Sequence, residues 1–324
     1  MMQVFLVDPF MMMYDAPLFF VEVFVSGLMA GVMYALVALG FVLIYKASGV
    51  FNFAQGAMVL FAALTFVGLW ELGVNPWLAL ILSALTMIAL AFCIERIVLR
   101  PLVNQDPIIF FMATIGITYF LDGFGQTIWG SEVRPLDIGI PNEPFMDFAD
   151  WSGLYINKFD VFAAVVCSVL VAVLAGFFTK TKIGRALRAV ADDHQAALSV
   201  GIPLKTIWTI VWSVAGIVGL AAGILWGSKL GVQFTLALIA FKALPVLILG
   251  GFTSIPGAIL GGLIIGAGEK IAEVYWGDAM GGAIEDWFAY VVALIFLLFR
   301  PQGLFGEKII ERVDKSATNH DELT

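Results

Sequence analysis

Residues 180–205 read KTKIGRALRAVADDHQAALSVGIPLK, and they form the one long internal segment of this apolar chain that we expect to lie in cytosolic water. Each Lys, Arg or Asp at the centre of a bilayer costs roughly 2.5 to 3.5 kcal/mol. The segment carries many such groups: Lys180, Lys182, Arg185, Arg188, Asp192, Asp193 and Lys205. It therefore predicts a loop that stays outside the hydrocarbon and separates two membrane spans.

Helical periodicity within this loop predicts a short amphipathic helix held against the membrane face. The apolar side chains fall mostly on one side of a helical wheel: Ala186, Leu187, Val190, Ala197, Leu198 and Val200. The polar ones fall mostly on the other: Arg185, Arg188, Asp192 and Gln195. Gly184 and Gly201 bracket the helix and Pro203 follows as a stop signal. The alternative is a solvated loop that only joins two spans.

The composition predicts an all-α polytopic membrane protein. Of 324 residues, 61% are hydrophobic and only 13% are charged, with a mean hydropathy of +0.98. A soluble domain of this length would carry about 25% charged residues. Cys93 and Cys167 both lie in apolar runs, which argues against a disulfide framework or a cysteine metal site. His194 and His320 are too far apart to suggest a metal pair.

A span needs about 20 apolar residues, and the sequence contains eight apolar stretches of sufficient length. They are residues 18–45, 50–70, 77–99, 108–129, 161–178, 207–227, 236–276 and 282–299. Basic residues after the first, third, fifth and last stretches place those ends in the cytosol. We therefore expect a single transmembrane domain over residues 1–324, with an outside N-terminal arm (1–17), an outer loop (130–159), a cytosolic loop (179–206) and a cytosolic tail (300–324).

The stretch 236–276 is long enough to cross twice, and residues 250–257, GGFTSIPG, predict a break within it. The chain then crosses nine times, or eight times with a re-entrant segment. The outer loop could receive a docking partner or could simply cap the bundle. Residues 307–324 alternate charges and predict a frayed cytosolic helix.

The charged loop at residues 180–205 also resembles a segment of a known protein family. The run from Gly184 to Asp192, with Ala196-Ala197 and Gly201-Ile202, resembles the coupling-helix loop of ABC importer permeases, above all the branched-chain (hydrophobic) amino acid uptake family. In that family the helix sits in a groove of the ATP-binding subunit. The resemblance implies that the residues coupling this chain to an ATPase are Gly184, Arg185, Arg188, Ala189, Asp192, Asp193 and Gly201.

A second motif, SGVFNFAQG at residues 48–56, puts two amides and two glycines where a span should begin. It follows a small-residue face, Gly27, Ala30, Gly31, Ala35 and Ala38, that would let another helix approach closely. Asn52 and Gln55 fit a capping box. Alternatively, the helix starts late and its free N–H groups meet a substrate carboxylate.

This block resembles the Asn-Phe-Ala-(His or Gln)-Gly signature of the same permease family, with Gln55 standing where many members carry His. The resemblance implies substrate-pathway roles for Asn52, Phe53, Gln55 and Gly56.

A third motif contains LGGFTSIPGA at residues 249–258 and further glycines up to Gly268. So many glycines indicate close helix contacts around a broken helix, with or without a pathway role. The block resembles the Gly-Gly, Ser-Ile-Pro-Gly and Gly-Gly segment of the family, and the closing RPQGLFG at 300–306 matches as well. The resemblance extends the pathway set to Gly250, Gly251, Ser254, Pro256 and Gly257.

Several charged residues lie in or near the spans. Lys242 is a functional candidate by its position, or it snorkels toward the outer interface. Asp122 is the best mid-span carboxylate for an ion-coupled carrier. Most of the others we interpret as interface or structural pairs: Glu22, Glu269 with Lys270, and Glu285 with Asp286.

The sequence lacks a G-x-x-x-x-G-K-[ST] motif and the common hydrolase and metalloprotease motifs. We therefore expect no enzyme activity and no cofactor bound by this chain, with ATP and Mg held by partners. The resemblance, which best fits the first-type paralogue, implies a multi-pass bacterial inner-membrane complex. Its other members are a paralogous second permease, two ATP-binding subunits and an extracytoplasmic solute-binding protein.

The expected contacts are these proteins and membrane lipids, with no nucleic acid. The implied function is to form half of the pathway for branched-chain or related hydrophobic amino acids. Urea, short amides or aromatic acids are alternative solutes, because specificity in the family rests largely with the binding protein. An ion-coupled secondary carrier or channel is the rival class, and a membrane enzyme is a weaker third.

Overall fold

The computed structural model describes residues 7–102, 105–192, 197, 199 and 201–306, and this part of the chain is almost entirely helical. Two isolated β-bridges, Arg134 with Val232 and Pro144 with Asn157, join loop segments. The all-α prediction is therefore confirmed. The predicted tail helix at 307–324 lies outside the described residues.

The helices follow the predicted apolar stretches closely. In chain order they are α2 (Asp8–Asp15), α3 (Pro17–Ser48), α4 (Gln55–Glu71), α5 (Pro76–Cys93), the π-helical turn η1 (Ile94–Leu99), the 3-10 turn η2 (Arg100–Leu102), α6 (Pro107–Trp129), α7 (Met146–Ser152), α8 (Lys158–Lys180), α9 (Lys182–Asp192), α11 (Leu204–Leu230), the 3-10 turn η3 (Phe234–Leu238), α12 (Ile239–Gly250), α13 (Ile255–Met280) and α14 (Ile284–Phe299). The break predicted within 250–257 is confirmed, because α12 ends at Gly250 and α13 starts at Ile255.

Six helical segments of the described chain are long and apolar enough to cross a membrane: α3, α5 continued through η2, α6, α8, α11 and α13. The helix α4 and the segment Phe234–Gly250 are apolar but shorter, and α14 has 16 residues. At 1.5 Å per residue such helices fall short of a hydrocarbon core of about 30 Å. Eight or nine crossings are reached only if these shorter helices also cross, so that number stays a prediction.

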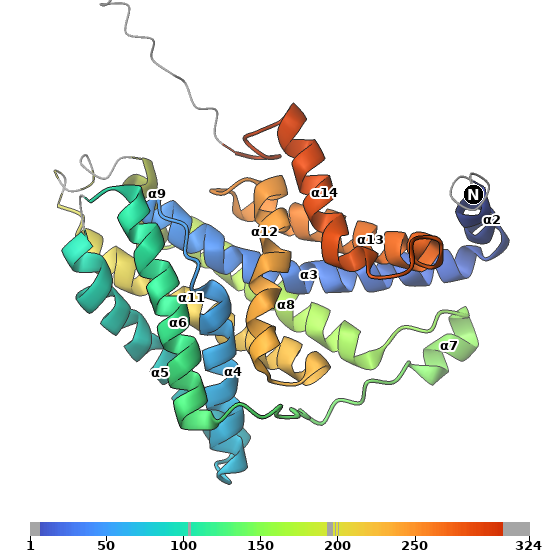
Figure 1. Ribbon diagram of the computed structural model, residues 1–324, viewed down its shortest axis with the longest axis horizontal. Coiled ribbons are helices and arrows are strands. Elements are labelled where there is room, and N and C mark those ends of the chain that lie inside the picture. The colour runs from blue at the N-terminus through green and yellow to red at the C-terminus, as the bar shows by residue number, and fades with distance from the viewer. Residues whose placement is uncertain (1–6, 103–104, 193–196, 198, 200, 307–324) are drawn as a thin grey trace, which may run out of the picture.

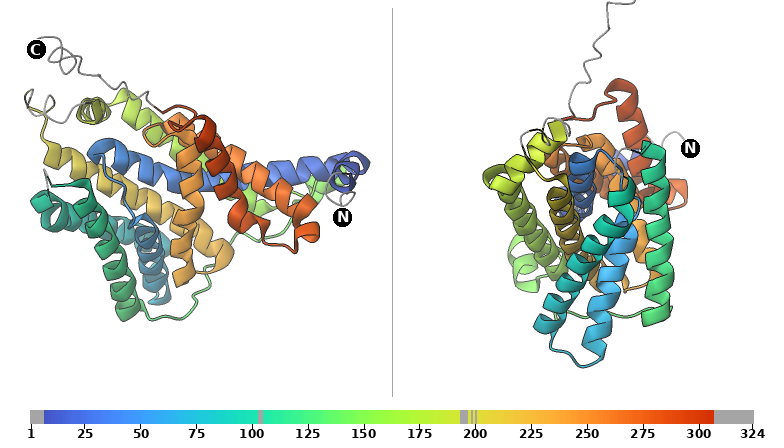
Figure 2. Two further views of the ribbon diagram at one scale, coloured as in Figure 1. Left: turned by 45° about the horizontal axis from the view of Figure 1, so that its top comes forward. Right: turned by 90° about the vertical axis from the view of Figure 1, so that its left-hand side faces the viewer.

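The long helix α3 is the centre of the bundle. It runs along the longest axis with α13 beside it, while α4, α5 and α6 form a group that projects to one side (Figures 1 and 2). Its most apolar window is 83% buried, against 28% for α5 and α6 and 22% for α8. Because α3 is enclosed on most sides, its small residues set how closely the neighbouring helices approach.

Glycines let α3 and α13 touch through their backbones. A Cβ added at Gly31 would lie 2.4 Å from the carbonyl oxygen of Gly262, and one at Gly27 would lie 2.7 Å from that of Gly266. In return, a Cβ at Gly266 would lie 2.4 Å from Cα of Gly31. Both helices therefore carry a Gly-x-x-x-Gly contact of the kind used in membranes. The predicted small-residue face is confirmed as a packing face at Gly27 and Gly31.

Basic residues gather where α9 meets the bundle. The helices α3, α8 and α11 all contact α9, and their nearby ends carry Lys46, Lys180 and Lys205. The helices α2 and α7 lie at the other end of the molecule (Figure 1). The positive-inside rule assigns the α9 end to the cytosol. This agrees with the predicted orientation, which itself stays a prediction.

Candidate functional site

The amphipathic helix predicted in the charged loop is confirmed as α9. Its apolar side chains Leu187 and Val190 are 1% and 0% exposed, whereas Arg185 is exposed to solvent. A solvated loop would leave those apolar side chains in water, so the alternative is excluded. The buried Ala197 continues the same contact surface beyond α9.

The start of α9 differs from the prediction at Gly184. This glycine does not bracket the helix but is its third residue, and Thr181 is the residue before the helix. Thr181 Oγ1 accepts a hydrogen bond from Gly184 N at 3.1 Å, which satisfies a free N–H of the first turn. A Cβ at Gly184 would lie 2.1 Å from the carbonyl oxygen of Phe178. Glycine is needed here because α9 folds back onto the last turn of α8.

The end of the loop behaves as predicted. Gly201 has a φ of +81°, and Ile202 N donates to Ala197 O at 3.0 Å. This is the hydrogen bond of a helix that ends with a left-handed glycine. Asp192 is the last residue of α9, and nothing is described of its side chain. Asp193, with the predicted face residues Leu198 and Val200, lies outside the described residues.

The break between α12 and α13 is a tight backbone junction. Ser254 caps α13 by accepting a hydrogen bond from Gly257 N at 3.0 Å, with Pro256 in the first turn. A Cβ at Gly250 would lie 2.3 Å from the carbonyl carbon of Gly257. Gly251 has a φ of +101°, a backbone conformation that glycine adopts without strain.

The closing segment 300–306 is bonded to this junction. Leu304 N donates to Leu249 O at 2.8 Å and Phe305 N donates to Gly250 O at 3.2 Å. A Cβ at Gly251 would lie 2.8 Å from Gly306 N. The third and the closing sequence motifs therefore form one unit, and the predicted close packing is confirmed.

This unit lies beside α9. A cavity of about 280 Å³ is lined by Leu187 and Arg188 of α9, by Ser254 and Pro256, and by Phe305. Lys46, near the end of α3, lines it as well. Arg188 Nη2 donates to Thr179 O at 3.3 Å, which holds its guanidinium against the end of α8. The structure thus places Ser254 and Pro256, predicted for the pathway, around the same cavity as Arg188, predicted for coupling.

Asn52 and Gln55 form a different arrangement from the capping box considered above. The residue before α4 is Ala54, and Asn52 Oδ1 accepts from Ala54 N at 3.0 Å. Asn52 Nδ2 donates to Gln55 Oε1 at 3.4 Å, so the two amides bond to each other rather than reciprocally to backbone N–H groups. The capping box is therefore wrong, and the late helix start, at Gln55, is confirmed.

Both amides are fully buried, at 0% exposure, and Gln55 Nε2 has no hydrogen-bond partner. A Cβ at Gly40 of α3 would lie 2.2 Å from that nitrogen, so the Gln55 side chain rests on the α3 backbone. A Cβ at Gly56 would lie 2.2 Å from Ala237 O of η3. The amide pair therefore sits where α3, α4 and η3 meet.

Aromatic rings connect this block to the third motif. Phe53 packs against Phe51 and Phe111, with ring centroids 4.5 and 4.8 Å away. Phe51 also lies 6.4 Å from Phe252, which is in the α12–α13 break. No substrate role for these residues is tested by the geometry, and the pathway assignment stays a prediction.

The charged residues in the spans pair across helices. Lys242 Nζ of α12 lies 3.7 Å from Glu269 Oε1 and 3.5 Å from Asp286 Oδ1, and Lys270 Nζ lies 3.3 Å from Glu285 Oε2. The prediction that these charged residues form structural pairs is confirmed, and each of them pairs with a residue on another helix. Lys242 is held in ion pairs and does not simply snorkel to an interface.

Sequence reasoning missed Tyr34, whose hydroxyl donates to Glu269 Oε1 at 3.0 Å. Glu269 is 2% exposed, and its Oε2 has no hydrogen-bond partner. The mid-span candidate Asp122 is half-buried and likewise has one carboxylate oxygen, Oδ1, without a partner. Within the described residues, no group of three or more His, Cys, Asp or Glu side chains could hold a metal ion.

The outer loop is tied to the bundle and contains the short helix α7. Arg134 bonds through its side chain to Glu71 and to Trp129 O, and Arg134 N donates to Val232 O at 2.9 Å. Such bonds suit a cap over the bundle. Docking of a partner onto this loop stays a prediction.

A family model described as "Branched-chain amino acid transport system / permease component" matches residues 23–300. The chain belongs to this permease family. The permease is 29% identical over 305 residues to the high-affinity branched-chain amino acid transport system permease protein BraD of Pseudomonas aeruginosa, covering 91% of this chain and 98% of that protein. It is 26% identical over 311 residues to LivH of Escherichia coli, with the same coverage.

The permease is also similar to the probable LivH of Methanocaldococcus jannaschii, at 30% identity over 285 residues, 84% of this chain and 88% of that one. The family recognised from the three motifs is thus confirmed. With six helices among the described residues able to span a membrane, the permease is a multi-pass protein of the cytoplasmic membrane and forms a membrane component of a transporter. It is a transport subunit rather than a catalytic one.

Proposed function

We propose that this permease forms half of the transmembrane pathway of an ATP-driven importer for branched-chain or related hydrophobic amino acids. The observation that carries the proposal is the family match over residues 23–300, with relatives whose names describe branched-chain amino acid permeases. A paralogous permease, two ATP-binding subunits that hold ATP and Mg, and an extracytoplasmic binding protein complete the complex. This chain contributes helices and binds no cofactor of its own.

The helix α9 is the proposed contact with an ATP-binding subunit. Its exposed side presents Arg185 to solvent, while Leu187 and Val190 fix it to the bundle. The close approach of Gly184 to the Phe178 carbonyl ties α9 to α8 without an intervening side chain. A push on α9 therefore moves α8 as well, because a packed backbone contact has little room to slide.

A second connection would carry the same movement toward the pathway. Arg188 and Leu187 share a cavity with Ser254 and Pro256, at the break between α12 and α13. The closing segment 300–306 is bonded to that break. Alternating access needs discrete rigid-body movements of helices, and a broken helix is a suitable hinge for them. We assign the hinge to Gly250, Gly251, Ser254, Pro256 and Gly257.

The amide pair Asn52 and Gln55, with Phe53 and Gly56 beside it, is the proposed polar point along the pathway. Gln55 Nε2 is a buried donor without a partner, which normally carries an energetic penalty. Such a donor can be retained because it bonds a passing solute in another state of the cycle. The substrate carboxylate is the group that it would meet.

The test is uptake by reconstituted proteoliposomes. We expect tritiated leucine, isoleucine or valine to accumulate when this chain, its paralogue, the two ATP-binding subunits and the binding protein are present with ATP. Vesicles with this chain alone should not accumulate them. Uptake by the chain alone, driven by an ion gradient, would instead establish a secondary carrier. Accumulation of urea, short amides or aromatic acids, with no uptake of hydrophobic amino acids, would show that the importer transports that class of solute instead.

A further inference from the structure

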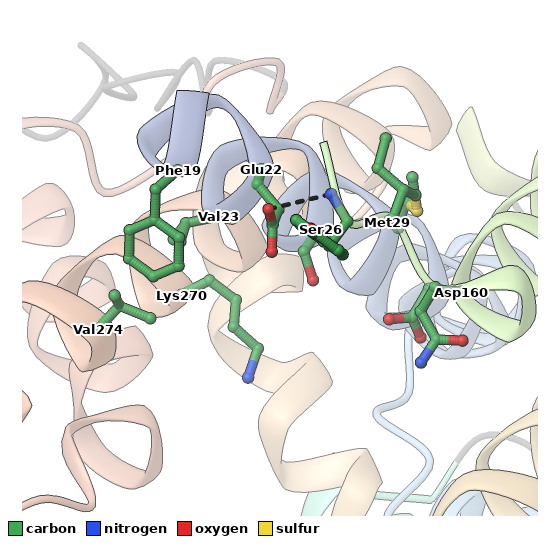
Figure 3. A pocket seen from close by; sticks show the side chains of 11 residues that line it. Phe19, Glu22, Val23, Ser26, Met29, Asp160, Lys270 and Val274 are labelled. Atoms are coloured by element: carbon green, nitrogen blue, oxygen red, sulfur yellow. Dashed lines mark hydrogen bonds between the residues drawn. The ribbon is translucent and has the colours of Figure 1, made fainter. Parts of the chain in front are cut away.

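A cavity of about 200 Å³ lies between α3, α13 and the segment that leads into α8. Figure 3 shows Glu22 of α3, Lys270 of α13 and Asp160 of α8 around it. It is close to the starts of α3 and α8 and therefore lies toward the end of the bundle that carries α2 and α7, away from α9 (Figure 1). On the predicted topology this end faces the outside, where the binding protein delivers the solute.

The cavity combines both signs of charge. Lys270 Nζ lies 3.3 Å from Glu285 Oε2, but an ammonium has three donors and can bond a second carboxylate. Glu22 uses Oε2 to accept a hydrogen bond from Tyr155 N at 3.1 Å, the dashed line in Figure 3. A carboxylate has about four acceptor positions, so Glu22 retains the capacity to bind an ammonium group.

Asp160 gives the cavity a second carboxylate. Its Oδ1 accepts a hydrogen bond from Lys229 Nζ at 2.7 Å. Together with the pair Lys270 and Glu285 and with Glu22, this makes three carboxylates and two ammonium groups around one region. A free amino acid is a zwitterion, so its ammonium group and its carboxylate can each meet a group of opposite charge here.

The rest of the wall is mainly apolar, with Ser26 and Asn157 as further polar lining residues. Phe19 and Val23 of α3 and Val274 of α13 line the same cavity, and Figure 3 shows Phe19 and Val274 together on one side of it. A cavity of about 150 Å³ is enough to bind benzene, so the present one suits a branched aliphatic side chain. A site with few polar groups and apolar walls is typical for a small ligand.

We propose that this cavity binds one free hydrophobic α-amino acid as it leaves the binding protein. Lys270 holds the α-carboxylate, Glu22 and Asp160 hold the α-ammonium group, and Phe19, Val23 and Val274 contact the side chain. This inference rests on the proposed function, and it adds an entry site at the opposite end of the bundle from α9.

The competing explanation is that these charges only join helices. The pair Lys270 and Glu285 separates the two explanations, because Glu285 does not line the cavity. If the lysine only joins α13 to α14, then Lys270→Met and Glu285→Gln have the same effect. If the lysine binds the ligand, only Lys270→Met weakens binding.

The experiment measures equilibrium binding of tritiated L-leucine to the assembled complex in nanodiscs without the binding protein. Isoamylamine, which lacks the carboxylate, and isocaproate, which lacks the amine, serve as competitors. We expect each to compete roughly tenfold or more weakly than leucine, the value of one charge-assisted hydrogen bond. Lys270→Met should weaken the binding of leucine by a similar factor and leave the binding of isoamylamine unchanged.

Glu22→Gln should have the opposite selectivity: it should weaken the binding of leucine and of isoamylamine and leave the binding of isocaproate unchanged. Two matched variants control for charge. Lys205 lies at the start of α11 and Glu132 lies in the outer loop, and both side chains are exposed and outside the cavity. The variants Lys205→Met and Glu132→Gln should therefore bind leucine as the wild type does. Thermal melting of each complex shows whether a variant is folded.

ATP-driven leucine uptake by the complete complex is measured in parallel. If uptake occurs but the wild type does not bind leucine, or if Lys270→Met and Glu22→Gln both bind leucine as tightly as the wild type, the cavity assignment is overturned while the proposed function stands. Equal loss of binding in Lys270→Met and Glu285→Gln also overturns it. If no hydrophobic amino acid is taken up at all, the proposed function itself fails.

Discussion

Lys242 Nζ and Glu269 Oε1 lie 3.7 Å apart and join α12 to α13 in the interior of the bundle. The carboxylate is 2% exposed and also accepts a hydrogen bond from Tyr34, while the lysine reaches a second acid, Asp286, on α14. Four helices therefore meet at one charged cluster. Removing one partner of a buried ion pair is far more costly than replacing both, because a charge is left unpaired.

The first prediction concerns this cluster. Lys242→Met should destabilise the permease by roughly 3 kcal/mol, since Glu269 loses its cation while remaining buried. The double variant Lys242→Met with Glu269→Gln should recover part of the loss. Thermal melting in detergent measures both, with the exposed Lys205→Met as control. If the melting temperature of Lys242→Met equals that of the wild type, the structural role of the lysine is contradicted. If uptake is then lost although stability is unchanged, the lysine has a role in transport.

These cross-helix pairs show what the sequence could not predict. The apolar helices, the break at 250–257 and the amphipathic helix of the charged loop follow from local patterns, and the structure reproduces them. The partner of Glu269 depends on packing between segments: Tyr34 is 235 residues away in the chain. The sequence predicts that these charged residues form pairs but does not name the partners, because the partners lie on other helices.

Two errors at helix starts have local causes. The spacing of Asn52 and Gln55 matches the sequence pattern of a capping box. In the structure, however, the chain makes an additional turn and α4 begins only at Gln55. At α9 the residue before the helix is Thr181, and the preference of Thr for that position was an available signal. Gly184 served instead for close packing, which only the position of Phe178 reveals.

The second prediction concerns the contact of α3 with α13. Gly31→Val would force side-chain atoms into the backbone of Gly262 and should lower stability by at least about 3 kcal/mol, the upper part of the range for overpacking. Gly116→Val is the matched control, because no atom lies within 4 Å of a Cβ there. Melting temperature and yield of folded protein measure the difference. Equal behaviour of the two variants would show that the helices do not touch at Gly31.

The third prediction concerns the connection between α9 and α8. Gly184→Val should displace α9 from the Phe178 carbonyl and abolish ATP-driven uptake in the assembled complex, while the bundle remains folded. Gly176→Val, in α8 with open space where the added Cβ would lie, is the control and should transport normally. ATP hydrolysis measured alongside should continue without stimulation by the loaded binding protein. Normal uptake by Gly184→Val would remove the coupling role from this contact.

A fourth prediction tests the charge on α9. Arg188→Glu should prevent productive contact with the ATP-binding subunit, because it reverses the charge beside the exposed side of the helix and removes the hydrogen bond to Thr179 O. Membrane insertion should be unaffected, since the residue lies outside the predicted spans. Co-purification of the ATP-binding subunits and uptake are the measurements. Arg188→Lys, which keeps the charge, should retain most of both, and full uptake by Arg188→Glu would exclude the proposed docking role.

The last prediction separates stability from transport at the buried amides. Gln55→Leu removes the unpartnered donor Nε2 but also Oε1, the acceptor for Asn52 Nδ2, so the two effects oppose each other and the variant should stay within about 1 kcal/mol of the wild type in stability. Asn52→Leu removes the acceptor for Ala54 N and should cost about 1 kcal/mol. Uptake should nevertheless fall in both, and most clearly in Gln55→Leu, because the unpartnered amide is the group proposed to meet the solute. Melting temperatures and leucine uptake are therefore measured on the same preparations. Wild-type uptake by Gln55→Leu would show that this amide serves only the packing of α4 on α3 and the hydrogen bond with Asn52, since Nε2 would then have no partner in any state of the cycle.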